Sequence, residues 1–278
     1  EYYVKAIDSN YTMAKFRLGN LYNRQNTIES AKLYYDLACN DSMVEAKNNF
    51  AGLYFEEKNY EKAIKYYEEA IVDGCKVALE NLGDLYYQTK DYQKAISYYL
   101  RNSTSVSCQK KLADIYMEAE NTDEAIIWYK KASNNEDIES SYKLGLIYED
   151  LNNLEDAKKY YLLAAKKNHL NAKLHLGRIY YNEGNYEESK KMLDVCANEN
   201  NAYAQHMVGL IYENYYSDHT NAKYWYEKSK NQGLVESIFN LGQISLKLEE
   251  DELAKKYFKQ GVEAKNKDSE YMLAGIYL

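Results

Sequence analysis

The sequence predicts an all-α fold: an α-solenoid, a right-handed superhelix of antiparallel helix pairs, with about eight repeats of about 32 residues. Three observations lead to this prediction. A phrase of the type Leu-Gly-x-Leu-Tyr returns nine times, and a second phrase with small residues seven apart follows the first eight copies at a nearly constant distance. A residue suited to start a helix stands between the two phrases in seven of eight repeats.

The first phrase predicts the first helix of each pair, helix A. Its successive copies lie 32, 32, 30, 32, 32, 32, 33 and 32 residues apart, which is the regular spacing of a solenoid. The copies begin at Leu18, Phe50, Leu82, Leu112, Leu144, Leu176, Val208, Leu241 and Leu273.

The second phrase predicts helix B, and Ala63-Ile64-Lys65-Tyr66-Tyr67-Glu68-Glu69-Ala70 is a clear example. Small residues seven apart return to one side of a helix every two turns, with large apolar side chains between them. The equivalent phrases begin at Ala31, Ala95, Ala125, Ala157, Ser189, Ala222 and Ala254.

The boundary between the helices predicts helix starts. Side-chain oxygens of Asn, Asp and Thr accept hydrogen bonds from the free N–H groups of a first helical turn, which stabilises the helix by about 1 kcal/mol. The residues four before the helix B alanine are Thr27, Asn59, Asp91, Asn121, Asn153, Asn185, Asp218 and Glu250.

The recurring glycine or alanine of helix A predicts close packing of the two helices. A glycine inside a helix costs about 0.5 to 1 kcal/mol relative to alanine, so its return indicates that an aromatic residue of helix B approaches the backbone there. The predicted core positions are Leu82, Gly83, Leu85, Tyr86, Ala95, Tyr99 and their equivalents in the other repeats.

Together the two phrases resemble the tetratricopeptide repeat family, which carries Leu-Gly-x-x-Tyr in helix A and Ala-x-x-x-Phe-x-x-Ala in helix B. The distance from Tyr54 to Ala63 is nine residues, as in that family, but the twelve residues from Ala70 to Leu82 are two fewer. The shorter join is similar to the Sel1-like repeat. The resemblance covers essentially the whole chain and implies the fold, with a concave groove lined by the A helices.

We expect one repeat array over residues 1–278 that is a fragment of a longer array. Residues 2–6 match the second half of a helix B, and Leu278 lies inside a helix A. Two apolar ends without a polar cap would expose hydrophobic surface and invite end-to-end self-association.

The composition of the chain argues against some classes of partner and indicates a type of source genome. The formal net charge of −8 argues against nucleic acid, because phosphate binding needs clustered Lys and Arg. No apolar run approaches the ~18 residues of a membrane span. The richness in Asn, Lys and Tyr without proline is compatible with a bacterial, A+T-rich genome.

The four cysteines share no pair spacing, which favours free thiols and a reducing, cytoplasmic compartment. A secreted or surface location stays open, because the expected fragment lacks its true N-terminus. Cys108 and Cys196 stand where other repeats have alanine, so we expect them to be small core residues.

No catalytic constellation and no cofactor-binding motif is found, so the sequence predicts a non-enzymatic protein without a cofactor. His175 and His206 lie on consecutive A helices, but no cysteine or carboxylate completes a recognisable metal-ligand set. We therefore expect no metal site and ordinary groove or surface histidines.

The expected groove is formed by the helix A positions five and two before, and two and five after, the first residue of the phrase. These positions, called groove positions below, share one helical face at about 100° per residue. An acidic section has Glu45, Glu80, Asp84 and Asp114. The candidate binding residues are Tyr87, Met117, Tyr142, Leu146, Leu174, Arg178, Tyr181, Tyr203, His206, Leu210 and Phe239.

Aromatic residues beside an arginine in a concavity are typical of binding hot spots. The leading hypothesis is a scaffold that binds a protein or peptide segment, with apolar side chains near Tyr142 to Phe239 and basic residues toward the acidic section. Two alternatives remain open. The chain is a peptide-sensing regulatory domain whose output domain lies elsewhere, or the apolar groove residues pack against one another as core.

Overall fold

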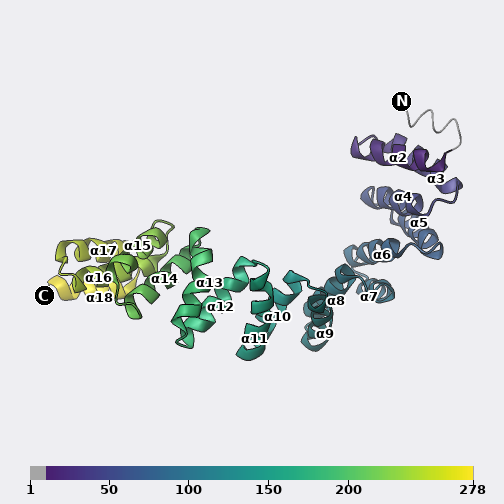
Figure 1. The fold of residues 1–278 in the computed structure, drawn as a ribbon. Helices are drawn as coiled ribbons and strands as arrows, with labels where there is room; N and C mark the ends of the chain where they lie inside the picture. The colour runs from purple at the N-terminus through teal and green to yellow at the C-terminus, as the bar shows by residue number, and fades with distance from the viewer. Residues whose placement is uncertain (1–10, 278) are drawn as a thin grey trace. The chain divides into compact units, whose positions relative to one another are not determined.

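The computed structural model describes residues 11–277, and the regular structure in this range is entirely α-helical (Figure 1). The expected all-α solenoid of helix pairs is confirmed. The A helices are α2 (Thr12–Arg24), α4 (Val44–Glu56), α6 (Lys76–Gln88), α8 (Val106–Glu118), α10 (Ile138–Asp150), α12 (Leu170–Asn182), α14 (Ala202–Asn214), α16 (Val235–Lys247) and α18 (Lys267–Tyr277). The B helices are α3 (Ile28–Asn40), α5 (Tyr60–Val72), α7 (Tyr92–Arg101), α9 (Thr122–Asn134), α11 (Leu154–Lys166), α13 (Tyr186–Asn198), α15 (His219–Lys230) and α17 (Asp251–Glu263).

The chain divides into two compact units, Glu1–Asn135 and Glu136–Leu278. Within each unit, every B helix packs against the A helix before it, and α3, α5, α7, α11, α13, α15 and α17 also pack against the A helix after it. The match of residues 2–6 to a helix B lies outside the described residues. A single array over residues 1–278 stays a prediction.

The turns between A and B helices follow the expected capping pattern. All eight predicted residues occupy the N-cap positions of the B helices, and five of their side chains accept a backbone N–H bond. The side chain of Asn59, for example, accepts from the Lys62 N–H at 3.3 Å. One residue of left-handed backbone precedes each cap, such as Lys58 with φ 61°. Each chain reversal is thus defined locally.

The glycine of helix A is the contact point for the aromatic residue of helix B. A Cβ atom added at Gly145 would lie 2.4 Å from the ring of Tyr161, and one added at Gly83 would lie 2.5 Å from the ring of Tyr99. These tyrosines are fully buried. The predicted close approach is therefore confirmed in both units.

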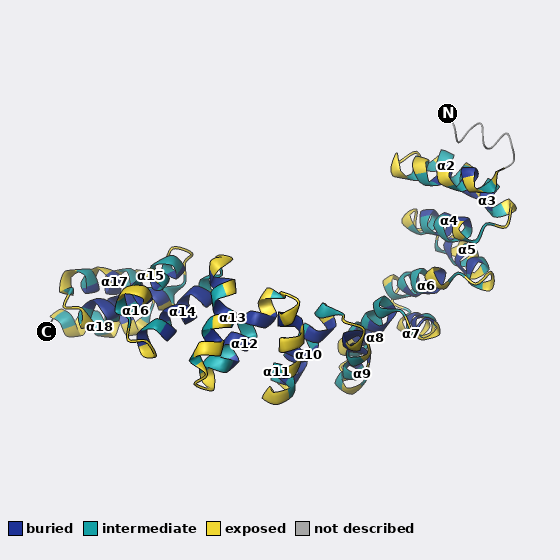
Figure 2. Cartoon of the chain, in the orientation of Figure 1, coloured by how far each residue is buried: buried dark blue, intermediate teal, exposed yellow. Residues whose placement is uncertain are grey.

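Most predicted core positions are buried, as the dark blue stretches within each helix pair indicate (Figure 2). Leu82, Leu85, Ala95 and Tyr99 are each at most 1% exposed. Tyr86 differs: it is only partly buried, and its ring stacks on that of Tyr98 with centroids 5.5 Å apart.

Four free cysteines are present among the described residues, and Cys108 and Cys196 are buried at the small core positions predicted for them. Two further small positions are occupied by serine. Ser140 is fully buried and its hydroxyl has no hydrogen-bond partner, whereas the buried hydroxyl of Ser189 donates to the Gly177 carbonyl at 2.7 Å.

Replacing Ser140 by alanine is expected to stabilise the C-terminal unit by about 1 kcal/mol. The change removes a hydroxyl that loses its hydrogen bonds to water on folding and gains none in the protein. The matched change Ser189→Ala is expected to destabilise by about 1 kcal/mol, since it deletes a satisfied bond. Urea unfolding of the two variants measures the difference. Equal effects of the same sign would contradict this account of the two sites.

Candidate functional site

The candidate binding residues lie on the A helices, at the places that the repeat assigned to them. Tyr142, Leu146, Leu174, Arg178, Tyr181, Leu210 and Phe239 are partly buried, Tyr87 is likewise partly buried, and Met117 and Tyr203 are exposed. His206 alone among them is buried. Most of the face therefore remains accessible.

In the N-terminal unit, asparagines from three successive A helices join in a hydrogen-bonded set. Asn49 Nδ2 donates to Asn20 Oδ1 at 2.9 Å, and Asn81 Nδ2 donates to Asn48 Oδ1 at 2.9 Å. They border a cavity of about 400 Å³. Its lining residues are Asn20, Asn23, Arg24, Tyr35, Asn48, Asn49, Gly52, Leu53, Glu56 and Asn81.

Asn49 and Asn81 stand one residue before the first residue of the phrase, outside the four groove positions. Lys111 and His175 occupy the same place in later repeats, and both contact the A helix of the preceding repeat. A signal existed in the sequence, because this place is polar in seven of the first eight copies. This place lies beside the helical face that the four groove positions share, so the groove pattern does not include it.

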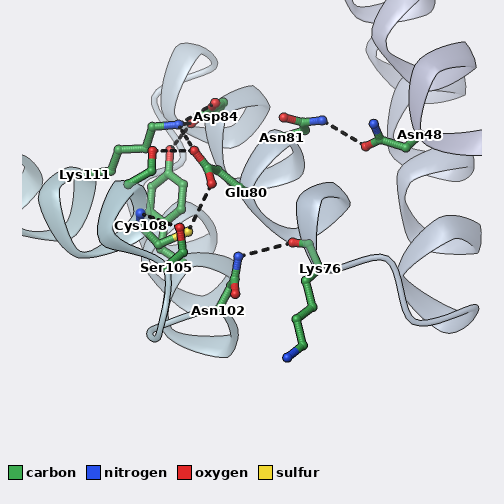
Figure 3. Close-up of polar contacts among 11 residues, drawn as sticks. Asn48, Lys76, Glu80, Asn81, Asp84, Asn102, Ser105, Cys108 and Lys111 are labelled. Atoms are coloured by element: carbon green, nitrogen blue, oxygen red, sulfur yellow. Dashed lines mark hydrogen bonds and ion pairs between the residues drawn. The ribbon is translucent and has the colours of Figure 1, made fainter. Parts of the chain in front are cut away.

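The expected acidic section carries less net charge than its sequence indicates. Lys111 Nζ bonds Glu80 Oε1 at 2.9 Å and both carboxylate oxygens of Asp84 at 2.7 and 2.8 Å (Figure 3). Burial opposes the ionisation of Glu80, but hydrogen bonds from Ser107 and Lys111 outweigh it and hold the pKa of this carboxyl below its ordinary value. Glu45 is exposed.

Several polar groove residues receive a hydroxyl from the core. The buried tyrosine that packs on the helix A glycine or alanine reaches across the helix and donates to a groove position. Tyr99 donates to Asp84 at 2.6 Å and Tyr35 to Asn20 at 2.7 Å. The other pairs of this kind are Tyr129 with Asp114, Tyr161 with Glu149 and Tyr226 with Glu213. These polar groove residues thus stabilise the repeat itself.

In the C-terminal unit, Arg178 is bound to Glu149 rather than free. The same carboxylate lies 3.1 Å from His175 Nδ1 and accepts the Tyr161 hydroxyl at 2.7 Å. The ring of Tyr142 lies against His169, with centroids 4.4 Å apart. This cluster joins α10, α11 and α12.

His206 lies inside the helix packing and not on an open groove face. Its side chain is 8% exposed, and its ring lies 5.5 Å from that of Tyr226. Nδ1 lies 2.9 Å from Ser237 Oγ. Because the Ser237 hydroxyl donates to Ser229, it accepts from His206, so Nδ1 carries the proton. His206 is therefore a link between α14 and α16.

This environment predicts a pH dependence of stability. Burial lowers the pKa of His206 below its ordinary 6.5, against smaller opposing effects of Glu236 and Glu213. The unfolded chain then binds the proton first, so stability is complete above pH 6.5 and is lost as the pH falls below it.

We expect His206→Asn, which keeps a donor for Ser237, to lose less stability between pH 7 and about 5.5 than the unchanged chain. Urea midpoints at the two pH values measure this. An identical loss in both chains would refute the assignment.

The other apolar candidates separate into anchored and open side chains. The ring of Tyr181 lies 5.4 Å from that of Tyr186, and its hydroxyl accepts from Asn214. Phe239 lies 6.0 Å from Phe258. Tyr203 is 39% exposed. Tyr181 and Phe239 therefore pack against aromatic rings of B helices, while Tyr203 remains open to solvent.

Within residues 11–277, no group of three or more His, Cys, Asp or Glu side chains is arranged to hold a metal ion. Among the described helices, none combines the length and the apolar composition that crossing a bilayer requires.

Comparison with known families agrees with the helix pairs. One family model described as Tetratricopeptide repeat matches residues 49–102 and 142–189, and a second with the same description matches 111–134 and 235–268. Together they cover more than half of the chain, which belongs to the tetratricopeptide repeat family. No curated protein matches the sequence significantly.

Solved structures share the fold. A protective antigen of uropathogenic Escherichia coli displaying an SLR fold superposes with a TM-score of 0.76 at 22% identity, over 99% of this chain and 66% of that one. This chain thus spans slightly less than two thirds of that antigen. A Sel1 repeat protein from Oxalobacter formigenes gives a TM-score of 0.62 at 18% identity, over 99% and 89% of the two chains. Such repeat folds are generally scaffolds for protein–protein interaction and are typically non-catalytic.

Proposed function

We propose that this chain is a non-enzymatic scaffold that binds peptide segments of partner proteins on the face formed by its A helices. The observation that carries the proposal is the asparagine-lined cavity of about 400 Å³ in the N-terminal unit. Repeat proteins of this architecture bury their cores between helix pairs, which leaves the groove side chains free to vary. The asparagine side chains are thus partly exposed beside the packing seam, which meets them where the Tyr35 hydroxyl bonds Asn20.

The asparagine cavity suits the main chain of an extended peptide. An amide side chain both donates and accepts, so it can pair with a peptide N–H and a peptide carbonyl at once. Asn48 and Asn81 are partly exposed and already aligned by their mutual bond. Gly52 also lines the cavity, and its lack of a side chain leaves space there for a ligand.

The aromatic groove residues of the C-terminal unit suit apolar side chains of a ligand. Tyr181 and Tyr203 offer large rings whose burial contributes most of the energy at typical interfaces. Glu149 neutralises Arg178, so the surface there is less cationic than its composition indicates. We therefore propose apolar anchoring rather than charge recognition in this unit.

The test begins with peptides selected on the unchanged chain from a random displayed library, whose affinities are then measured by fluorescence polarisation. We expect Asn48→Ala with Asn81→Ala, or Tyr181→Ala with Tyr203→Ala, to weaken each selected peptide about tenfold, while thermal unfolding remains cooperative. Leu33→Ala is the control, because Leu33 is 56% exposed on helix B.

Selected peptides that lose affinity with Leu33→Ala, but with neither double variant, would overturn the proposal. So would a selection that yields no specific peptide. A collapse of thermal stability in the tyrosine double variant would show that these rings belong to the core.

A further inference from the structure

A second kind of surface occurs where a B helix meets the end of the next A helix. At two of these joints the C-cap residue of the A helix extends its side chain back to the preceding B helix. Glu57 bonds Lys32 at 2.5 Å, and Glu183 bonds Lys158 at 2.7 Å. The joint is thereby filled by an ion pair between two fixed repeat positions.

At the joint of α13 and α14 an aromatic ring fills the same place. The C-cap is Tyr215, and its ring lies 5.1 Å from that of Tyr186. Lys190, at the position of Lys32 and Lys158, lies over the ring of Tyr212 at 5.2 Å. Tyrosine is thus a side chain that this joint can accept.

At the joint of α7 and α8 neither filling is present. The C-cap is Ala119, whose methyl group cannot reach α7, and the lysine position is occupied by Ile96. Tyr92 and Tyr116 stand where Tyr186 and Tyr212 stand in the other joint. A cavity of about 470 Å³ remains, lined by Tyr92, Gln93, Ile96, Ile115, Tyr116, Glu118, Ala119 and Asn121.

We propose that the cavity between α7 and α8, here called the α7–α8 pocket, binds a tyrosine side chain presented by a partner protein or peptide. The partner's ring would take the place that Tyr215 takes on Tyr186, in edge or tilted contact with Tyr92 and on the aliphatic side chain of Ile96. Gln93, Glu118 and Asn121 also line the pocket, and the Gln93 amide can pair with the phenolic hydroxyl.

The chemistry of the lining favours an aromatic ligand over an aliphatic one. Two tyrosine rings line the pocket beside Ile96 and Ile115, and an aromatic ligand gains edge or tilted ring contacts with them that an aliphatic ligand cannot make. Tyr92 is 40% exposed, so its ring is open to contact. No groove position lines the pocket, although the groove residue Tyr87 adjoins it: its ring lies 5.5 Å from that of Tyr92, and its hydroxyl donates to Glu118 at 2.5 Å.

The test uses N-acetyl-tyrosinamide as the probe and follows the backbone amide signals of the isotope-labelled chain by nuclear magnetic resonance. We expect saturable shifts at Gln93, Ala119 and Asn121. N-acetyl-leucinamide is the aliphatic comparison. We expect its dissociation constant to be at least about threefold higher, because it lacks the ring contacts of the tyrosine probe.

Ala119→Tyr is the decisive variant, because it gives α8 the C-cap that α14 has and fills the pocket from within. It is expected to weaken binding of the tyrosine probe about tenfold or more and to raise the thermal midpoint. Leu248→Tyr is the matched control, since it adds a tyrosine at the C-cap of α16 and leaves the α7–α8 pocket open.

Three results would overturn the proposal: no saturable shift in the unchanged chain, equal binding of the tyrosine and leucine probes, or undiminished binding by a folded Ala119→Tyr chain. If Ala119→Tyr fails to fold, Ile96→Lys tests the same pocket. It places in this joint the lysine that Lys158 and Lys190 provide at the same position of other repeats. Undiminished binding by that folded variant would also contradict the proposal.

Discussion

Replacing Gly145 by valine is expected to destabilise the α10–α11 pair by about 3 kcal/mol, near the upper end of the usual cost of overpacking. The added Cβ would lie 2.4 Å from two ring atoms of Tyr161, far inside normal carbon contact. Tyr161 is fully buried and cannot swing away without opening the seam. Hydrogen exchange at the amides of α10 and α11 measures the loss locally, as suits a repeat protein.

Gly52→Val is the matched control for this change. Gly52 also lies inside a helix A, but an added Cβ would meet only the Tyr67 hydroxyl, at 3.7 Å. We expect its stability to change by less than about 0.5 kcal/mol, because no contact is forced. A similar loss in both variants would mean that the helix, and not the seam, resists the side chain.

Replacing Lys247 by methionine is expected to destabilise the α14–α16 region by about 2 kcal/mol. The Glu213 side chain is 7% exposed, and its carboxylate binds Lys247 at 2.6 Å and the Tyr226 hydroxyl at 2.8 Å. Removing one partner of a fully buried pair costs roughly 3–5 kcal/mol, and we expect less here because half of the Lys247 side chain is exposed.

Urea unfolding measures this loss, and Lys247→Arg is the control because it keeps the positive charge. Adding Glu213→Gln to Lys247→Met is expected to recover part of the stability, since the unpaired buried charge is then absent. A single variant Lys247→Met as stable as the unchanged chain would show that Glu213 is satisfied without it.

The helix pairs were predictable because their determinants are local. Asn59 and Asp91 cap helices through residues three positions further along, so spacing alone identifies them. The contact of Gly83 with Tyr99 was predictable for a different reason: the cost of an interior glycine, repeated in several repeats, requires a packing partner.

The state of the groove was not predictable in the same way. The charge of Glu80 and Asp84 depends on Lys111, which belongs to the next repeat and lies beside the face that the sequence pattern defined. His206 is buried because Ser237 of α16 provides its hydrogen bond. These contacts join different repeats, and a pattern read within one repeat does not contain them.

The α7–α8 pocket shows the same limit of local reading. The interval of 30 residues before Leu112 marks this joint as different, but does not show that a cavity results. Only the comparison of Ala119 with Tyr215, each at the end of its helix A, relates the cavity to a side chain that fits it.

The central claim is that packing lies between the helix pairs while the A-helix face binds a peptide. Titration of the isotope-labelled chain with a library-selected peptide tests this claim most directly. The account predicts saturable amide shifts at A-helix residues such as Asn48, Gly52 or Tyr203, with the B-helix amides around Leu33 unmoved. Shifts confined to the B helices would contradict it.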